Sequence, residues 1–445
     1  MRYDLVVRSR RAVLPDGTRA ASVAVSGGAI AAIADYGDGL DAEQHVDLGE
    51  LVLLPGLVDS HVHVNEPGRT DWEGFVTATR AAAAGGVTTI CDMPLNSLPP
   101  TVSVSALAEK RAAAAGNVWV DVAFWGGAVP GNSAAMRPLH EAGVTGFKCF
   151  LADSGVPEFP PLGPADLRSV LADLAAMGAL LIVHAEDGAE IRPASGRDFG
   201  AFVASRPPAA ERRAIEKVIA AAAASGARAH IVHLSAADCV AMIAGAKAAG
   251  IRLTAETCPH YLYFAAEQVP DGATEFKCCP PIRDAANREA LWRGLEAGVI
   301  DCVVSDHSPC PPELKAPGTG DFGEAWGGIA SVQLGLSAVW TVARRRGRTL
   351  EEVARWMAAG PARLAGLPGK GRLAVGCDAD LVAFDPGDSY VVEPARLLHR
   401  HPVTPYAGRT LTGRVRQTWL RGTALLDSAT GVPDGEPAGR LLNRA

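Results

Sequence analysis

The sequence predicts an α/β fold, a TIM (β/α)8 barrel with a small β-sandwich domain formed by both chain ends. Three observations lead to this prediction. The chain has 445 residues, which is too long for one ordinary domain. Both of its ends have the pattern of strands without helices. The middle alternates short apolar runs with alanine-rich amphipathic stretches, and eight strand-then-helix units close into a barrel of parallel strands.

The two ends of the chain carry the period-two pattern of half-buried strands. Near the N-terminus, Val23 and Val25 precede a Gly27-Gly28 pair that predicts a hairpin turn. Residues 380–384 and 418–422 have the same texture near the other end. We therefore predict a composite β-sandwich domain from residues 1–53 and 376–445, beside a barrel formed by residues 54–375.

The middle of the chain contains eight candidate strands, each followed by a plausible helix. They lie near residues 53–63, 86–94, 118–127, 143–151, 178–187, 227–235, 251–262 and 300–309. The run Thr70-Asp71-Trp72-Glu73 predicts a capping box at the start of the first helix. An open doubly wound sheet is the alternative. No Gly-x-Gly-x-x-Gly motif follows any of these strands, which removes the commonest ligand of such a sheet, a dinucleotide.

Composition and charge narrow the possible partners. A net charge of -7 gives no basic patch for phosphate backbones, so we expect no nucleic-acid partner. We find no apolar run long enough to span a bilayer and no secretion signal, so we expect no membrane partner and a cytoplasmic location. The nine cysteines show no C-x-x-C spacing and are expected to be reduced.

Six chemically distinctive side chains fall at the carboxyl ends of predicted strands, where the active sites of such barrels lie. His61 and His63 are one residue apart on a strand, so their side chains point the same way. Taken singly, a histidine after an apolar run is commonly a hydrogen-bonded core residue, and an aspartate there can simply cap a turn. Together at one rim, six such residues predict a metal centre: His61, His63, Lys148, His184, His233 and Asp306.

Lys148 is the least ordinary of these residues, because a bare ammonium beside Phe147 and Phe150 on a buried strand would be costly. Its neutral amine could add carbon dioxide and become a carbamate, an anionic ligand able to bridge two metals. The alternative is a lysine that reaches the rim to pair with an acid. Four imidazoles, a bridging anion and a carboxylate suit two Zn²⁺ ions that share a hydroxide. Asp306 can accept the proton of that hydroxide, so the predicted chemistry is hydrolysis without an organic cofactor.

Seven stretches of the chain resemble the cyclic amidohydrolases, which are binuclear-zinc TIM-barrel enzymes that open ring amides. The stretches are residues 55–63, 66–68, 146–148, 183–186, 232–235, 256–261 and 305–309. The resemblance implies that His61 and His63 bind the more buried zinc and that His184 and His233 bind the other. It also implies that N6-carboxylated Lys148 and a hydroxide bridge the two ions, that Asp306 is both ligand and catalytic base, and that the chain forms a homotetramer.

The substrate is a narrower question within this family. Dihydroorotases usually carry an arginine two residues after the His-x-His pair, where this chain has Asn65. Dihydropyrimidinases and hydantoinases carry a tyrosine shortly after the bridging lysine, and none follows Lys148. Allantoinases are more similar, through residues 66–69 with 72–74, 93–96, 146–150, 280–284, 306–313 and 325–329, of which the last two stretches are specific. The resemblance therefore implies a cyclic ureide substrate, with hydrolysis of the hydantoin ring of allantoin to allantoate. A scaffold relative that lacks the metals is a further alternative, but here all six ligand positions are filled.

Four residues are candidates for contacting the substrate: Asn96, Cys279, Trp326 and Gly327. Asn96 could bond the ureido tail or shape a turn after Pro94. Cys279 stands where allantoinases have a serine, a change that is tolerable if the contact is made by the backbone. Trp326 and Gly327 could form a wall that allows close approach to the ring, or simply begin a helix.

Overall fold

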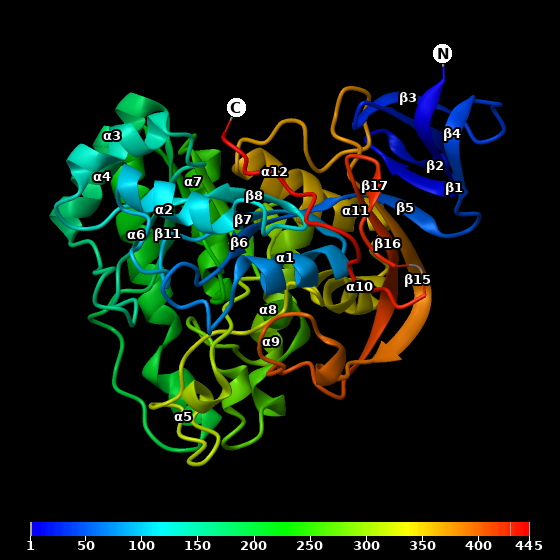
Figure 1. Cartoon of the computed structure of the whole chain (residues 1–445). Coiled ribbons are helices and arrows are strands. Elements are labelled where there is room, and N and C mark those ends of the chain that lie inside the picture. The colour runs from blue at the N-terminus through cyan, green and yellow to red at the C-terminus, as the bar shows by residue number, and fades with distance from the viewer. Residues whose placement is uncertain (1, 428, 445) are drawn as a thin grey trace.

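A computed structural model describes residues 2–427 and 429–444. It shows a barrel ringed by helices and, beside it, a sheet that combines the blue start of the chain with its orange and red end (Figure 1). The predicted fold, a barrel with a smaller β domain from both ends, is confirmed.

The small domain is one eight-stranded sheet with the order β17-β16-β15-β5-β1-β2-β3, in which β4 also pairs with β1. Its strands are β1 (Tyr3–Leu14), β2 (Gly17–Ser26), β3 (Ala29–Asp35), β4 (Ala42–Asp47), β5 (Val52–Pro55), β15 (Leu381–Val391), β16 (Thr410–Leu420) and β17 (Thr423–Ala424). The two chain ends meet at β5, which pairs in parallel with β1 and antiparallel with β15. The predicted hairpin turn joins β2 to β3, with Gly27 and Gly28 at φ of 59° and 82°.

Each of the eight predicted barrel strands contains a strand of the structure. They are β6 (Leu57–Val62), β7 (Val87–Asp92), β8 (Asp121–Phe124) with its continuation β9 (Gly126–Gly127), β10 (Phe147–Phe150), β11 (Leu180–His184), β12 (Arg228–Ile231), β13 (Leu253–Thr257) and β14 (Cys302–Val303). Neighbouring strands of the barrel pair with each other in parallel. A parallel bridge between Val62 and His307 closes the ring between its last and first strands. The carboxyl ends of all these strands therefore face one rim.

Helices surround the barrel (Figure 1). They are α1 (Phe75–Ala84), α2 (Val104–Ala114), α3 (Ser133–Glu141), α4 (Pro164–Met177), α5 (Phe199–Ser205), α6 (Pro208–Ser225), α7 (Val240–Ala248), α8 (Pro259–Tyr263), α9 (Ala285–Glu296), α10 (Gly335–Arg345), α11 (Leu350–Ala354) and α12 (Gly360–Leu364). Among the described residues, one large apolar cluster packs these helices against the strands.

Two local predictions need correction. The first barrel strand begins at Leu57 rather than near residue 53, because Val52–Pro55 belongs to the small sheet as β5. The chain passes between the two sheets at Gly56, where an added Cβ would lie 2.2 Å from Thr88 Oγ1. The capping box is also wrong. Helix α1 begins at Phe75, whose N–H donates to Glu66 Oε2 at 2.9 Å, and Glu73 turns inward instead.

A buried ion network joins the barrel to the small sheet. Asp121, the first residue of β8, accepts from Lys370 Nζ at 2.6 Å and from Arg421 at the end of β16. Lys370 also donates to Asp380, just before β15, at 2.8 Å. Since breaking a buried pair leaves an unpaired charge, this network fixes one domain against the other.

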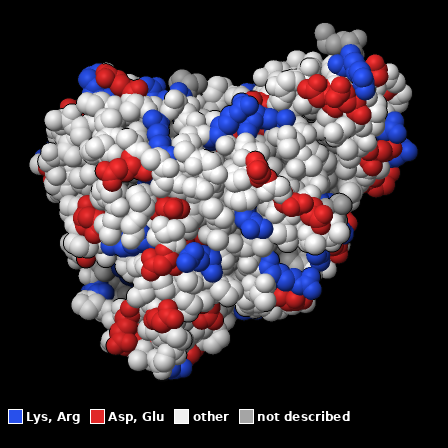
Figure 2. All heavy atoms as spheres, viewed as in Figure 1, with Lys and Arg blue, Asp and Glu red and all other residues white. Residues whose placement is uncertain are grey.

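The outer surface is mixed in charge, with acidic and basic side chains interspersed on the face shown in Figure 2. All nine cysteines are free thiols. In the part of the chain that the structure describes, no helix combines the length and apolar character needed to cross a bilayer.

Candidate metal centre

The carboxyl ends of the barrel strands open into one cavity of about 720 Å³. Its lining includes every residue that the sequence singled out for the site: His61, His63, Asn96, Lys148, His184, His233, Cys279, Asp306, Trp326 and Gly327. His61 lies on β6, Lys148 on β10 and His184 at the end of β11, whereas His233 and Asp306 follow β12 and β14. The parallel barrel thus brings together side chains that are far apart in the sequence.

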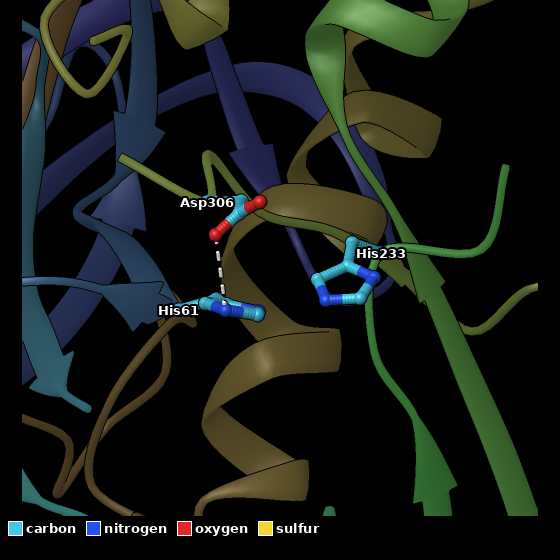
Figure 3. A group of neighbouring side chains, drawn as sticks. All are labelled: His61, His233 and Asp306. Carbon is cyan, nitrogen blue, oxygen red and sulfur yellow. Dashed lines mark ion pairs between the residues drawn. The ribbon is translucent and has the colours of Figure 1, made fainter. Parts of the chain in front are cut away.

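Five of the six candidate ligands are linked by short distances, and Lys148 lines the same cavity. Asp306 Oδ1 lies 3.1 Å from His61 Nε2 and 3.6 Å from His63 Nε2. His184 Nδ1 lies 3.0 Å from His233 Nε2. Figure 3 shows His61, His233 and Asp306 converging on one region, and their ligand atoms all lie within 4.8 Å of one another. This spacing suits a cation bound among them.

Two buried imidazole nitrogen atoms in this group make no well-aligned hydrogen bond within the described residues, even though Asp306 Oδ1 lies near one of them. They are His61 Nε2 and His233 Nδ1. An unsatisfied buried polar atom is costly, so such atoms call for a partner that protein groups do not supply. Imidazole nitrogens beside a carboxylate are the donors that zinc and similar divalent ions prefer. The residues therefore fit a divalent metal centre.

The outer hydrogen bonds orient the imidazoles toward the cavity. His61 Nδ1 donates to Glu256 Oε1 at 2.5 Å, which leaves Nε2 facing Asp306. His184 Nε2 donates to Glu186 Oε2 at 2.8 Å, which leaves Nδ1 facing His233. A carboxylate behind a histidine fixes its tautomer and increases its basicity as a ligand.

Neither carboxylate is among the site residues predicted from the sequence, although the sequence contains a signal for each. Glu186 stands two residues after His184 at the end of the same strand, so it was open to the alternation argument that paired His61 with His63. Glu256 is a fully buried acid on β13 that also accepts from His230 Nε2 at 2.9 Å. The position of this acidic residue in a barrel strand was the signal by which Glu256 could have been identified.

Burial shifts the pKa values of the ionisable groups in the centre. It lowers the pKa of His63 and His233 well below the usual histidine value, which keeps both rings neutral and able to bind metal. Burial opposes ionisation of Asp306, but the neighbouring His61, with His233 and His63, outweighs it and holds the pKa of that carboxyl well below its usual range. The carboxylate therefore stays charged.

Lys148 is only 1% exposed, and it forms no ion pair with any carboxylate of the described residues. Its Nζ lies 5.0 Å from the centre of the Phe150 ring. Burial lowers the pKa of Lys148 to about 8, although Asp306 and Glu256 act in the opposite direction. The rim ion pair considered as the alternative is therefore not what the structure shows, and the amine is readily deprotonated.

Three residues of the site have a left-handed backbone that side chains rarely adopt. The φ angles are 73° at Asn96, 39° at His233 and 46° at Asp306. Such strain is commonly kept where a side chain must be aimed in one direction. The Asn96 carbonyl is further held by Arg69 Nη1 at 2.9 Å, and Asn96 Nδ2 lies 3.4 Å from His63 Nδ1.

The predicted substrate contacts line the same cavity. Trp326 meets Trp72 edge to face at 5.0 Å, and a Cβ added to Gly327 would lie 3.4 Å from Cys279 Sγ. Arg283 does not pair with its neighbour Asp284, because it donates to Glu211 Oε1 at 2.7 Å.

Fold and centre together define a class, and the chain belongs to the amidohydrolase family, whose model matches residues 52–425. Within it, the chain is 55% identical to the allantoinase of Streptomyces avermitilis, over 99% of both chains. It is 43% identical to the allantoinase of Arabidopsis thaliana, over 96% of this chain and 89% of that one. The solved structure of the L-hydantoinase (dihydropyrimidinase) from Arthrobacter aurescens has a TM-score of 0.93 at 32% identity and covers 99% of this chain and 100% of that one.

Proposed function

We propose that this chain is a metal-dependent allantoinase that hydrolyses the hydantoin ring amide of allantoin to give allantoate. The observation that carries the proposal is the convergence of four histidines, one lysine and one aspartate on a single cavity. The match with curated allantoinases over nearly the whole chain selects the substrate.

Two Zn²⁺ ions are the proposed cofactor. His61 and His63 would hold one, His184 and His233 the other, and Asp306 would complete the set, with N6-carboxylated Lys148 between the two ions. Burial favours the uncharged amine, whose lone pair can attack carbon dioxide to form the carbamate, and the absence of an acidic partner within the described residues leaves Lys148 free for this reaction. When bound, the ions would lower the pKa of water and polarise the ring carbonyl.

The residues of the chain account for the remaining chemistry. Asp306 is charged, and Ser308 Oγ donates to its Oδ1 at 3.1 Å, which fixes the carboxylate. We assign it the role of accepting the proton of the attacking water and passing it to the leaving ring nitrogen. The new C–O bond replaces the ring C–N bond, and the product carries a carboxylate.

Asn96, Cys279, Trp326 and Gly327 are proposed to hold the substrate. They line the same cavity as the metal-binding residues and combine polar groups with an apolar surface. Such a combination positions a small polar ring and limits the access of bulk water.

A hydantoinase or dihydropyrimidinase is the second candidate, because a solved structure with a TM-score of 0.93 to this chain carries those names. The loop after Lys148 argues against it, since Leu151, Ala152 and Asp153 stand where those enzymes carry a tyrosine. A dihydroorotase is disfavoured by Asn65, which donates to the Pro309 carbonyl at 3.3 Å.

The decisive experiment measures ring opening of allantoin, hydantoin, dihydrouracil and dihydroorotate by one preparation whose metal content is known. We expect about two metal ions per chain and the highest kcat/KM with allantoin. Asp306→Asn should bind metal less tightly and lose at least about a hundredfold in kcat. Faster turnover of dihydrouracil than of allantoin would replace the proposed substrate, and a metal-free, inactive protein after zinc-supplemented expression would favour a scaffold.

We also propose a domain organisation, an oligomeric state and a cellular location for this protein. Residues 1–53 and 376–445 would act as one composite domain beside a barrel of residues 54–375. The protein would assemble as a homotetramer and work in the cytoplasm.

A further inference from the structure

Two buried lysines beside the cavity have no acidic partner. Lys277 is 9% exposed and Lys315 is 6% exposed, and neither forms an ion pair with a carboxylate of residues 2–427 or 429–444. Apart from the candidate ligand Lys148, the other buried lysines of the described residues are paired, Lys110 with Asp92 and Lys370 with Asp380. Because a buried, unpaired ammonium is costly, these two positions require another explanation.

Both ammonium groups donate to main-chain carbonyls of one short segment, residues 323–328, which we call the cavity wall. Lys277 Nζ lies 2.5 Å from the Ala325 oxygen and 3.4 Å from that of Gly323. Lys315 Nζ lies 2.5 Å from the Gly328 oxygen and 3.0 Å from that of Trp326. Four carbonyls of six consecutive residues are thus held by two cations.

Every residue of the cavity wall lines the cavity, and none of them belongs to a helix or strand. The wall has three further main-chain ties: Trp326 N–H donates to the Leu314 carbonyl at 2.6 Å, Gly328 N–H to the Lys277 carbonyl at 2.8 Å and Ala325 N–H to the Asp321 carbonyl at 3.0 Å. Since no regular element fixes this backbone, its position depends on these few bonds, of which those from the ammonium groups are the strongest.

Gly327 is where the wall can act on a ligand. Its N–H has no hydrogen-bond partner among the described residues, and it belongs to the same peptide group as the Trp326 carbonyl that Lys315 holds. A cation at the carbonyl end of a peptide group polarises it and makes its N–H a stronger donor. A neutral tie at the same place would position the peptide group without this effect.

We propose that Lys277 and Lys315 are positioning residues that hold the cavity wall against the substrate, and that Lys315 strengthens the Gly327 N–H as a donor to an oxygen of the cyclic ureide. The proposal rests on the proposed function for the identity of the substrate, but the anchoring of the wall does not depend on it.

The first test is kinetic and uses the metal-loaded enzyme. In Lys315→Met and Lys277→Met, we expect KM for allantoin to rise about tenfold or more, with kcat within about threefold of the wild type and metal content unchanged, because a charge-assisted tie to the binding surface is lost. Lys315→Arg, which keeps a cation, should recover part of the loss. Lys247→Met is the matched control, since Lys247 also holds a main-chain carbonyl, that of Val299, but far along the chain from the wall.

The second test is hydrogen–deuterium exchange and needs no substrate. The amides of Trp326 and Gly328 should exchange at least about tenfold faster in the methionine variants, while the barrel strands remain as protected as in the wild type. If wild-type protein failed to open allantoin, the proposed function would fall, whereas faster exchange in the variants would still support the anchoring.

Two results would overturn the proposal. One is unchanged KM and unchanged exchange of the wall in both methionine variants. The other is loss of metal and of kcat at constant KM, which would assign the lysines to the metal centre. Should Lys315→Met fail to fold, Lys277→Met tests the same anchoring through the other two carbonyls.

Discussion

Lys148 shows how far a single residue can be placed for function at the expense of stability. With a pKa of about 8, its ammonium is disfavoured by the fold, whereas the unfolded chain restores the ordinary value of 10.5. The folded state therefore binds fewer protons between these two values. The penalty is full below pH 8 and disappears as the pH rises toward 10.5.

We therefore expect Lys148→Met to stabilise the metal-free protein at pH 7 by up to about 3 kcal/mol while abolishing activity. Urea unfolding in chelator and carbon dioxide-free buffer measures the difference in the free energy of unfolding. The gain should shrink between pH 8 and pH 10.5. A variant less stable than the wild type at pH 7 would contradict the cost that we assign to the buried amine.

Glu256 is the second residue whose effect can be isolated, because it bonds both His61 and His230. Glu256→Gln keeps the shape but removes the charged acceptor behind His61. We expect metal affinity to fall by about tenfold to a hundredfold, with the fold retained. Competition with a chelator measures the change, and Glu289→Gln, which removes a half-exposed carboxylate, is the control.

At the scale of elements, the sequence patterns predicted the barrel strands well, but they did not predict the junction between the barrel and the small sheet. Eight apolar runs marked the strands because burial on both faces gives continuous apolar stretches. The boundary between β5 and β6 was missed, since one apolar run, Val52 to Val58, serves two sheets and only Gly56 separates them.

The candidate site likewise contains residues that the sequence predicts and residues that it does not. The strand-end position of the six ligand candidates can be read from alternation and rim placement alone. Lys277 and Lys315 could not be found so, because their partners are main-chain carbonyls that any sequence offers. The false capping box also has a physical reason. Glu73 accepts from His307 at 3.2 Å inside the protein, and Glu66 bonds the first turn of α1 instead.

The junction element itself can be tested. In Gly56→Ala, the new methyl group would clash with Thr88 and with Asp380 Cβ, 2.8 Å away, so we expect a loss of about 2 kcal/mol in the free energy of unfolding. Adding Thr88→Ala should restore part of it. Gly37→Ala, where the added carbon meets nothing within 4 Å, should change stability by less than about 0.5 kcal/mol. Equal effects at both glycines would rule out the close approach as the cause.

At the scale of the whole molecule, the network around Lys370 and Asp121 decides how firmly the two domains are joined. Lys370→Met leaves Asp121 and Asp380 buried with one cation fewer, so we expect a loss of about 3 kcal/mol. The midpoint of urea unfolding measures it. Arg396→Met removes an exposed pair with Glu393 and should cost less than about 0.5 kcal/mol. A comparable loss in both variants would show that the network does not join the domains.

The position of β5 affects the order in which the parts of the protein fold during synthesis on the ribosome. Its partner β15 is translated only after the entire barrel, so β5 presents one unpaired edge for most of synthesis. The nascent barrel can close behind it, but β15 (Leu381–Val391) must be synthesised before that edge is covered. Truncated chains that end before Leu381 should therefore be the species that chaperones retain.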